Sequence, residues 1–387
     1  MDVVDLARLQ FAGTTSIHWL FVILTLGLVP LVAVTHTAAV LSRDQARKAV
    51  LLKATRFWGQ LYVVNYALGI VTGLVMEFQF GLGWSGLGKF AGNVIGAPIA
   101  LETLVAFFAE STFLGMWIFG WGRLRPAVHA TLIWLVALTA YASAYFILVA
   151  NGFMQHPVGY GARDGTAYLT DLAAVMTNPS ALLALTHITA AALMTGAMFV
   201  AGVSAYRFLK GDREFFQGWL RWGTVAAAVL SIAVYEVGAL QYPLLGTTQP
   251  AKLAALESNG VVAQAHDIML YIGYSINTIT VLAAILVFFK RMVRWIAWSA
   301  IVTVPLPFVA SLGGWLFREI GRQPWIVYGE LTVDQAVSHV SAATMWTSLV
   351  AFLAVLVALA VANWWLIARF VRRGPDGVHI GREEQLS

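Results

Sequence analysis

The chain has 387 residues, of which 59% are hydrophobic and only 11% are charged, and its mean hydropathy is +0.76. Because water-soluble globular proteins carry about 25% charged residues, this composition excludes that class and indicates an integral membrane protein. The net charge of +5 does not indicate nucleic-acid binding, since the long apolar runs leave no soluble basic face. There is no cysteine. Disulfides, iron–sulfur clusters, thiolate-bound copper and covalently attached c-type haem are therefore excluded, and any metal must be held by His, Met or carboxylate.

About 20 consecutive apolar residues can cross a bilayer as a helix, and nine stretches of the chain meet that length. The predicted spans lie near residues 15–41, 57–80, 97–121, 128–151, 181–206, 219–245, 267–289, 295–317 and 337–369. The first ten residues contain Asp2 and Asp5 and lack a basic n-region, so they do not predict a cleavable signal peptide. No linker or repeat is visible, and we expect one all-α membrane domain over residues 1–387.

Lysine and arginine are distributed unevenly between alternate connections. Of the 24 Lys and Arg residues, 18 fall on one side of the predicted spans, and the other six are Arg8, Lys89, Arg163, Lys252, Arg318 and Arg322. Cytoplasmic connections carry the excess of these residues, so we expect the N-terminus outside and a cytoplasmic tail over residues 370–387. The longest connections on the outer side are then 152–180, 246–266 and 318–336.

Five potential metal ligands from five predicted spans fall near the outer side of the membrane. They are His18, Glu102, His187, Met269 and Glu319. A lone His or Met in a span is more often a packing residue, and we place His36, His129, His156 and His339 in that class. The common depth of the five distinguishes them, because ionisable residues inside a membrane are functional candidates. Depth alone does not identify the group that they would bind.

Three of these spans suggest particular chemistry. His187 and Met269 offer His/Met axial ligation, which leaves a haem iron six-coordinate and suited to electron transfer. Glu110 follows Glu102 by eight residues on one predicted helix, which places it about 12 Å deeper. That separation indicates a ligand and a proton relay rather than a paired acid and base. On the next span, Ser143 and Asn151 are candidate relay groups, although helix packing explains such polar residues equally well.

The eighth span ends in the stretch L-G-G-W-L-F-R-E-I-G-R-Q-P-W, residues 312–325. Arg318, Glu319 and Arg322 therefore lie where lipid gives way to water. A carboxylate at membrane depth costs about 3 kcal/mol or more unless it is paired or ligated. The residues alone allow two readings, a salt-bridged helix end and a ligand site.

This stretch resembles the signature of subunit I of the cytochrome bd-type oxidases, and other matching segments follow in the family's order. They are R-L-Q-F-A (8–12) with His18, G-L-V-M-E-F-Q-F-G (73–81), G-A-P-I-A-L-E (96–102), F-F-A-E-S-T-F (107–113), L-V-A-N-G (148–152), Q-P-A-K-L-A-A-L-E (249–257) and G-R-Q-P-W (321–325). The nine predicted spans also agree with this family. The resemblance implies helical bundles that enclose haems in a multi-pass protein of the bacterial cell membrane.

The resemblance also implies a role for each matching residue. His187 and Met269 would ligate a low-spin haem b, while His18, Glu102 and Glu319 would serve two high-spin haems. One of these would be a haem b and the other a haem d or a further haem b. The remaining implied roles are an electron path through Trp315, a proton path through Glu110, Ser143 and Asn151, haem propionate contacts from Arg8 and Arg322, and quinol contacts from Lys252 and Glu257.

The implied activity is that of a terminal oxidase. Electrons would pass from quinol through the low-spin haem to the two high-spin haems, where O2 is reduced to water with protons from the cytoplasm. Glu102, Glu110, Trp315 and Glu319 would carry this reaction within the chain. The resemblance also implies a second membrane subunit, subunit II, and allows a further small subunit with a single span. It implies no nucleic-acid partner.

Two departures from the family pattern concern the electron donor. Connection 246–266 is short where the family has a long outer loop that binds quinol. Asp267 stands where the family usually has Arg, and an anion beside a haem would lower its potential and remove a propionate partner. One alternative is therefore a bd-like oxidase with another donor, such as cytochrome c. A second alternative is a haem-free transporter in which the buried Glu and His residues bind substrate.

Overall fold

The computed structural model describes the whole chain except residues 259, 288, 290–292 and 382–387. Within the described part, nine helical segments are long and apolar enough to cross a membrane, which confirms the predicted all-α membrane fold. Three of the basic residues used to predict the orientation, Lys290, Arg291 and Arg382, lie outside the described residues. The same holds for the last six residues of the predicted tail.

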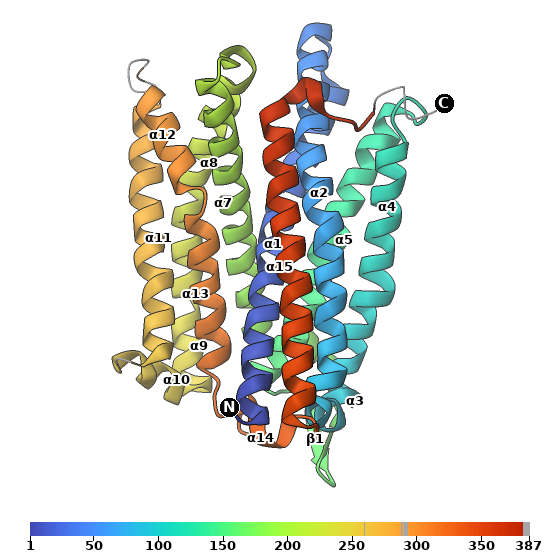
Figure 1. Ribbon diagram of the computed structural model, residues 1–387, viewed down its shortest axis with the longest axis vertical. Coiled ribbons are helices and arrows are strands. Elements are labelled where there is room, and N and C mark those ends of the chain that lie inside the picture. The colour runs from blue at the N-terminus through green and yellow to red at the C-terminus, as the bar shows by residue number, and fades with distance from the viewer. Residues whose placement is uncertain (259, 288, 290–292, 382–387) are drawn as a thin grey trace.

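The elements follow one another as long helices with short connections (Figure 1). The spanning segments are α1 (Val3–Leu41), α2 (Gln45–Gly83), α3 (Ser85–Leu101) continued by a π-helical segment (Glu102–Phe107) and α4 (Phe108–Phe119), α5 (Pro126–Gln155), α6 (Leu172–Met176) with α7 (Pro179–Leu209), α8 (Arg213–Ala239) with α9 (Gln241–Thr248), α11 (Val261–Leu286), α12 (Val293–Thr303) with α13 (Leu306–Ile320), and α15 (Ala342–Arg373).

Several helices are longer than the hydrophobic stretches that predicted them, because polar caps set their ends. Asp2 accepts a hydrogen bond from the backbone N–H of Asp5, so α1 begins at Val3 rather than near residue 15. Asp44 caps α2 in the same way. The third segment begins at Ser85, well before the predicted residue 97, since hydropathy marks the apolar part of a helix and not its start.

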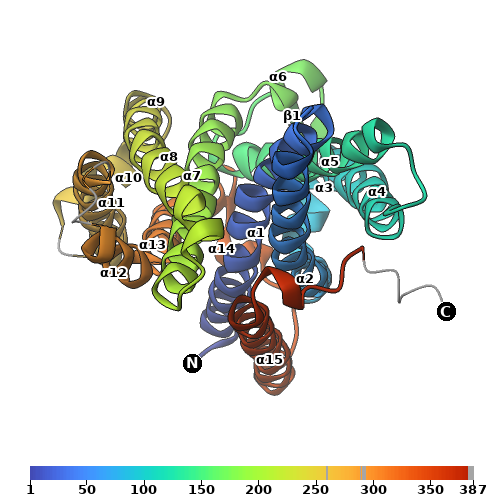
Figure 2. The ribbon, with the colours of Figure 1, turned by 90° about the horizontal axis from the view of Figure 1, so that it is seen from above.

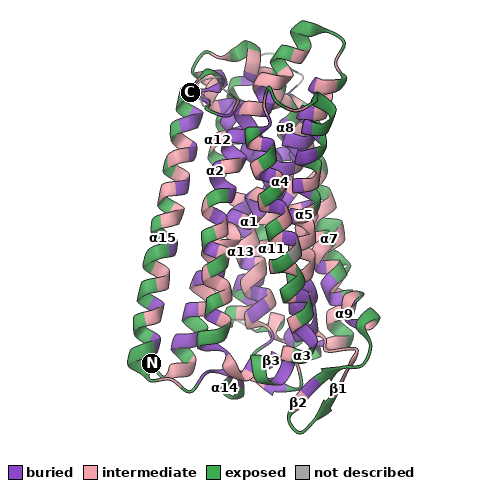
Figure 3. Cartoon of the chain, turned by 90° about the vertical axis from the view of Figure 1, so that its right-hand side faces the viewer, coloured by how far each residue is buried: buried purple, intermediate pink, exposed green. Residues whose placement is uncertain are grey.

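Seen from above, α1 and α7 lie in the middle of the molecule (Figure 2). Helices α8, α11 and α13 lie on one side of them, and α2, α4 and α5 on the other. The most apolar window of α7 is 72% buried within the protein, whereas that of α11 is 11% buried and that of α15 is 17% buried. Much of α15 is exposed (Figure 3). The exposed large apolar side chains, as expected of lipid-facing helices, include Ile268, Leu282 and Ile285 on α11 and Trp346, Val350 and Val361 on α15.

The end of the molecule that carries the N-terminus is closed by short elements (Figure 1). Two antiparallel hairpins lie there, β1 (Tyr160–Arg163) with β2 (Thr166–Leu169), and β3 (Trp325–Val327) with β4 (Leu331–Thr332). Helices α10 (Pro250–Ala254) and α14 (Val333–Ala336) complete it. Below, this end is called the N-terminal end, and the candidate site residues gather toward it.

Two glycines allow the central helices α1 and α7 to touch. A Cβ atom on Gly27 would lie 2.2 Å from the carbonyl oxygen of Ala192 and 2.9 Å from the backbone nitrogen of Gly196. Close backbone approach of this kind is how membrane helices gain packing energy without a hydrophobic driving force.

We expect Gly27→Ala to destabilise the protein by about 1–3 kcal/mol or more, because backbone atoms of α7 cannot move aside as a flexible side chain could. The matched control is Gly115→Ala in α4, where an added Cβ meets nothing within 4 Å. Thermal unfolding of the detergent-purified variants, followed by tryptophan fluorescence, measures the difference. Equal unfolding temperatures for the two variants would contradict this account of the α1–α7 contact.

Candidate functional site

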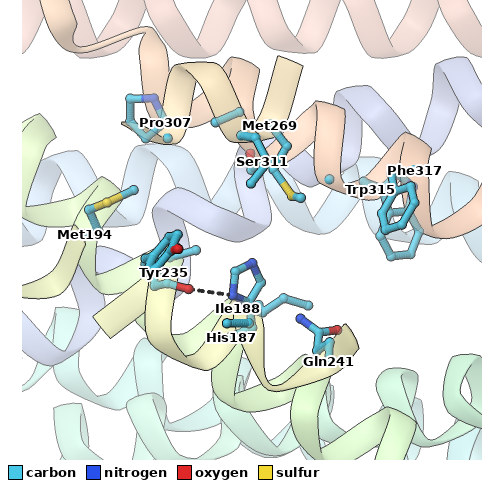
Figure 4. A pocket seen from close by; sticks show the side chains of 18 of the residues that line it. His187, Ile188, Met194, Tyr235, Gln241, Met269, Pro307, Ser311, Trp315 and Phe317 are labelled. Carbon is cyan, nitrogen blue, oxygen red and sulfur yellow. Dashed lines mark hydrogen bonds between the residues drawn. The ribbon is translucent and has the colours of Figure 1, made fainter. Parts of the chain in front are cut away.

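A cavity of about 570 Å³ lies between α7, α8, α11 and α13. Its walls are mostly apolar and include Trp19, Ile188 and Trp315. His187 from α7 and Met269 from α11 reach into it from opposite walls (Figure 4). The structure therefore brings together two residues that are 82 positions apart in the sequence.

Backbone contacts fix which nitrogen of His187 is available. Its Nδ1 lies 3.1 Å from the carbonyl oxygen of Val234, and a carbonyl can only accept a hydrogen bond, so Nδ1 carries the proton. The lone pair is then on Nε2, the arrangement usual for histidines that bind a metal through that atom. Gly238 makes room for this ring, since a Cβ there would lie 3.0 Å from Cε1. Gly314 does the same for Met269, with a Cβ 2.7 Å from Sδ.

His18 on α1 has the same tautomer for a similar reason. Its Nδ1 lies 2.8 Å from Oγ1 of Thr72 on α2, and that hydroxyl donates its own proton to the carbonyl oxygen of Gly69 at 2.6 Å. The hydroxyl must therefore accept from Nδ1–H, which leaves the His18 Nε2 lone pair free to bind a metal.

Glu102 lies at the first position of the π-helical segment, an irregularity that is frequent at functional sites. Ser143 on α5 donates to its Oε1 at 2.6 Å. The hydroxyl of Thr103 lies 3.1 Å from Oε2 of Glu102 and 2.6 Å from Oε1 of Glu77. Glu77, for which no role was predicted, thus belongs to the same polar cluster. Because Thr103 has one hydroxyl proton, it cannot fully serve both carboxylates.

Glu319 is buried at the end of α13 with three protein partners. Arg322 donates to its Oε2 at 2.7 Å, while Asn151 and Gln155 from α5 donate to Oε1 at 2.8 Å and 3.3 Å. The salt-bridged helix end is therefore present. The Nε and Nη1 atoms of Arg322 have no partner among the described residues, so this guanidinium can still receive an anion.

Arg318 and Lys252 also line the cavity. Lys252 is only 3% exposed, its ammonium donates to the carbonyl oxygen of Arg318 at 2.9 Å, and it lies 4.8 Å from the ring centre of Phe317. Burial lowers the pKa of Lys252 well below its ordinary value; the charge of Arg318 adds to this effect, and Glu319 opposes it. Glu257, the other residue expected at the quinol site, is exposed.

The three expected proton-path residues do not form one chain of hydrogen bonds among the described residues. Ser143 contacts Glu102, and Asn151 contacts Glu319. Glu110 is buried and accepts a hydrogen bond of 3.4 Å from the hydroxyl of Tyr62 on α2, which the sequence did not single out.

Arg8, expected beside a haem propionate, lies on the exposed side of α1. Its described ion-pair partner is Asp5, at 4.0 Å on the same helix. Its side chain is 41% exposed, so of the two arginines proposed for propionates only Arg322 is buried.

One aromatic contact was not anticipated. The rings of Trp19 and Trp315 are stacked, with centroids 5.4 Å apart and planes 13° from parallel. Trp19 directly follows His18, and both tryptophans line the cavity that contains His187 and Met269. The position of Trp19 next to His18 in the sequence could have marked it as a candidate site residue. Its contact with Trp315 can be seen only in the folded structure.

The candidate ligands are dispersed. Among the residues that the structure describes, no three His, Cys, Asp or Glu side chains gather as they would around a bare metal ion. A macrocycle that supplies most of its own metal ligands needs only one or two axial side chains from the protein. The cavity has apolar walls, a histidine with a free Nε2, a thioether and, at one end, two cations. These features fit a haem with its carboxylates.

Three comparisons with known proteins each find bd-type oxidases. The family described as "Cytochrome bd terminal oxidase subunit I" matches residues 6–266 and 258–375, two stretches that overlap within the short connection. Cytochrome bd ubiquinol oxidase subunit 1 of Bacillus subtilis is 34% identical over 97% of this chain and 95% of its own length. Cytochrome bd-II ubiquinol oxidase subunit 1 of Escherichia coli is 41% identical over 66% of this chain and 50% of its own length.

A solved structure shares the fold. The bd oxidase from Geobacillus thermodenitrificans superposes with a TM-score of 0.89 at 25% sequence identity, covering 97% of this chain and 99% of that one.

We expect Gly314→Ala to move Met269 Sδ away from its place in the cavity while leaving the fold intact, because the contact is with the end of a flexible side chain. A displacement that costs about 1.4 kcal/mol lowers the Met–iron ligation equilibrium tenfold. In optical spectra of the purified Gly314→Ala complex, we expect part of the low-spin haem signal to be replaced by a high-spin signal. Gly218→Ala on α8, where a Cβ meets nothing within 4 Å, is the control, and identical spectra for both variants would remove Met269 from the site.

Proposed function

This chain belongs to the cytochrome bd terminal oxidase subunit I family, and we propose that it binds three haems and draws electrons from quinol. It is a multi-pass subunit of a bacterial terminal oxidase. The observation that carries the proposal is the cavity with His187 and Met269 on opposite walls and the His187 Nε2 free. Haem, when bound, supplies the electron transfer and the oxygen chemistry.

At the proposed electron-entry site, the protein holds the haem in place and keeps water away from it. His187 and Met269 are proposed as the axial ligands of a low-spin haem b, a pairing that raises its potential. The Val234 carbonyl keeps the His187 ring in one tautomer, and the apolar walls exclude water. The Trp19–Trp315 stack leads from this cavity toward His18, which supports Trp315 as part of an electron path.

His18, Glu102 and Glu319 are proposed to serve the two high-spin haems, one a haem b and the other a haem d or a further haem b. Two helices connect these residues. Helix α2 holds His18 through Thr72, and α5 holds Glu102 through Ser143 and Glu319 through Asn151. Each candidate ligand is thus oriented by a second polar side chain, as metal ligands commonly are.

Protons for oxygen reduction are proposed to come from the cytoplasmic side by way of Glu110. Its carboxyl group is buried and its Oε1 accepts from the Tyr62 hydroxyl, so Glu110 is placed to take up a proton within the membrane and pass it on. Ser143 and Asn151 then act at the far end of the path, beside Glu102 and Glu319. This direction follows from the proposed orientation, with the N-terminus outside and the C-terminus in the cytoplasm.

Quinol is the proposed donor because the two relatives from Bacillus subtilis and Escherichia coli are named as ubiquinol oxidases. The segment from Gln241 to Glu257 covers the outer end of the cavity, and the exposed Glu257 is available there to a donor. One observation favours a second candidate, a donor such as cytochrome c. In its described residues 241–257, the connection that would form a loop over the donor consists of three short helices.

As in its family, the chain is proposed to work with subunit II in the bilayer, with room for a small single-span subunit. The exposed apolar faces of its peripheral helices leave surface for both lipid and such partners. The haem-free transporter alternative is not retained, because the chain belongs to an oxidase family over nearly its whole length.

Oxygen consumption by the purified complex, with reduced quinol and reduced cytochrome c supplied in parallel, tests the proposal. We expect turnover with quinol, and we expect Glu257→Gln to raise the KM for quinol several-fold at little change in kcat. The exposed Glu330→Gln is the control on the same end of the molecule. Turnover with cytochrome c alone would move the donor to the second candidate, and no turnover with either donor despite bound haem would exclude both.

A further inference from the structure

The outer end of the cavity has more positive than negative charge. Three cationic side chains, Lys252, Arg318 and Arg322, surround one carboxylate, Glu319, and that carboxylate is paired with Arg322 at 2.7 Å. Among the described residues, no ion pair joins a carboxylate to Lys252 or to Arg318. A buried cation without an anionic partner is strongly disfavoured, so the arrangement calls for negative charge from outside the chain.

These two cations face the cavity rather than the solvent. Both line it, and Lys252 is almost completely buried. The only protein acceptor described for the Lys252 ammonium is a backbone carbonyl, that of Arg318. A carbonyl satisfies one N–H bond and leaves the charge uncompensated. Two carboxylates at this end would balance the two cations.

The position of Arg318 gives the distance to the candidate ligand. Its Nε donates to Oδ1 of Asn151 at 2.7 Å, and its Nη2 lies 3.4 Å from the carbonyl oxygen of Ser180. Ser180 precedes His187 by seven residues on α7, which is two turns or about 10 Å along the axis and returns to nearly the same face. Arg318 therefore lies about 10 Å from His187 along α7, where it could reach a carboxylate of a haem bound to His187.

Asp267 does not disturb this balance. It directly follows the buried His266 and is two positions before Met269, but its side chain is 54% exposed and its carboxylate is 3.7 Å from Nδ1 of His266. Asp267 does not line the cavity. The negative charge that the sequence places next to the candidate ligand is directed away from it by the fold.

From this geometry we infer that Lys252 and Arg318 bind the two carboxylates of the haem held by His187 and Met269. Lys252 is then a positioning residue that acts through the haem, and not a contact of the electron donor. The inference rests on the proposed function and assigns to these two residues a role separate from donor binding. A positive charge beside a haem carboxylate would favour the reduced haem over the oxidised haem, because the reduced form carries one positive charge less.

The test is the midpoint potential of the low-spin haem, measured by spectroelectrochemistry on the purified holo-complex. Lys252→Met keeps the length of the side chain and removes the charge. We expect it to lower the equilibrium constant for reduction about tenfold, which is about 59 mV for a one-electron couple. Lys252→Arg should restore the potential. Arg318→Lys, which keeps the charge, should leave the potential nearly unchanged, and Arg318→Gln should lower it in the same direction as Lys252→Met.

Arg163→Gln is the matched control, a cation on the same end of the molecule that is 82% exposed. If Lys252→Met lost quinol turnover with an unchanged midpoint potential, Lys252 would be a donor contact and the inference would be overturned while the proposed function stood. If Lys252→Met failed to assemble, an unchanged potential in Arg318→Gln would overturn the inference. Absence of a low-spin haem from the unaltered complex would instead be the failure of the proposed function.

Discussion

The structure depends on one arrangement, a histidine and a methionine facing each other across an apolar space inside the membrane. A space of this kind has to be kept open by the residues around it. Gly238 and Gly314 provide room at the two side chains, and the Val234 carbonyl fixes the proton on His187. The close packing of α1 against α7 through Gly27 and Gly196 then holds the wall that carries His187. A flat macrocycle with two axial ligands matches these constraints, and a small metal ion does not.

The second constraint is electrostatic. At the N-terminal end, Glu319 is fully paired within the protein, yet the cations Lys252 and Arg318 are not. Charge balance therefore depends on what the cavity contains. The short connection between α8 and α11 contributes Lys252 to the cavity, whereas its Glu257 is exposed to solvent. Under the proposed assignment, this connection therefore contacts the haem as well as the donor.

Much of this could be predicted from the sequence, and the rest could not for physical reasons. Hydropathy gave the number of spans, and the depth of polar residues along them selected His187 and Met269, which do share a cavity. Hydropathy does not show where a helix begins or which way a residue points around it. The stacking of Trp19 on Trp315 and the contact of Tyr62 with Glu110 depend on how helices pack. For the same reason, the outward direction of Asp267 could not be read from its place beside Met269.

The central claim, that His187 and Met269 are the axial ligands of one haem, is tested most directly by near-infrared magnetic circular dichroism of the oxidised complex. This spectrum distinguishes the axial ligand pairs of a low-spin haem. The account predicts a His/Met signature that disappears in Met269→Leu. A bis-histidine signature in the unaltered complex, or a His/Met signature that persists in Met269→Leu, would contradict it.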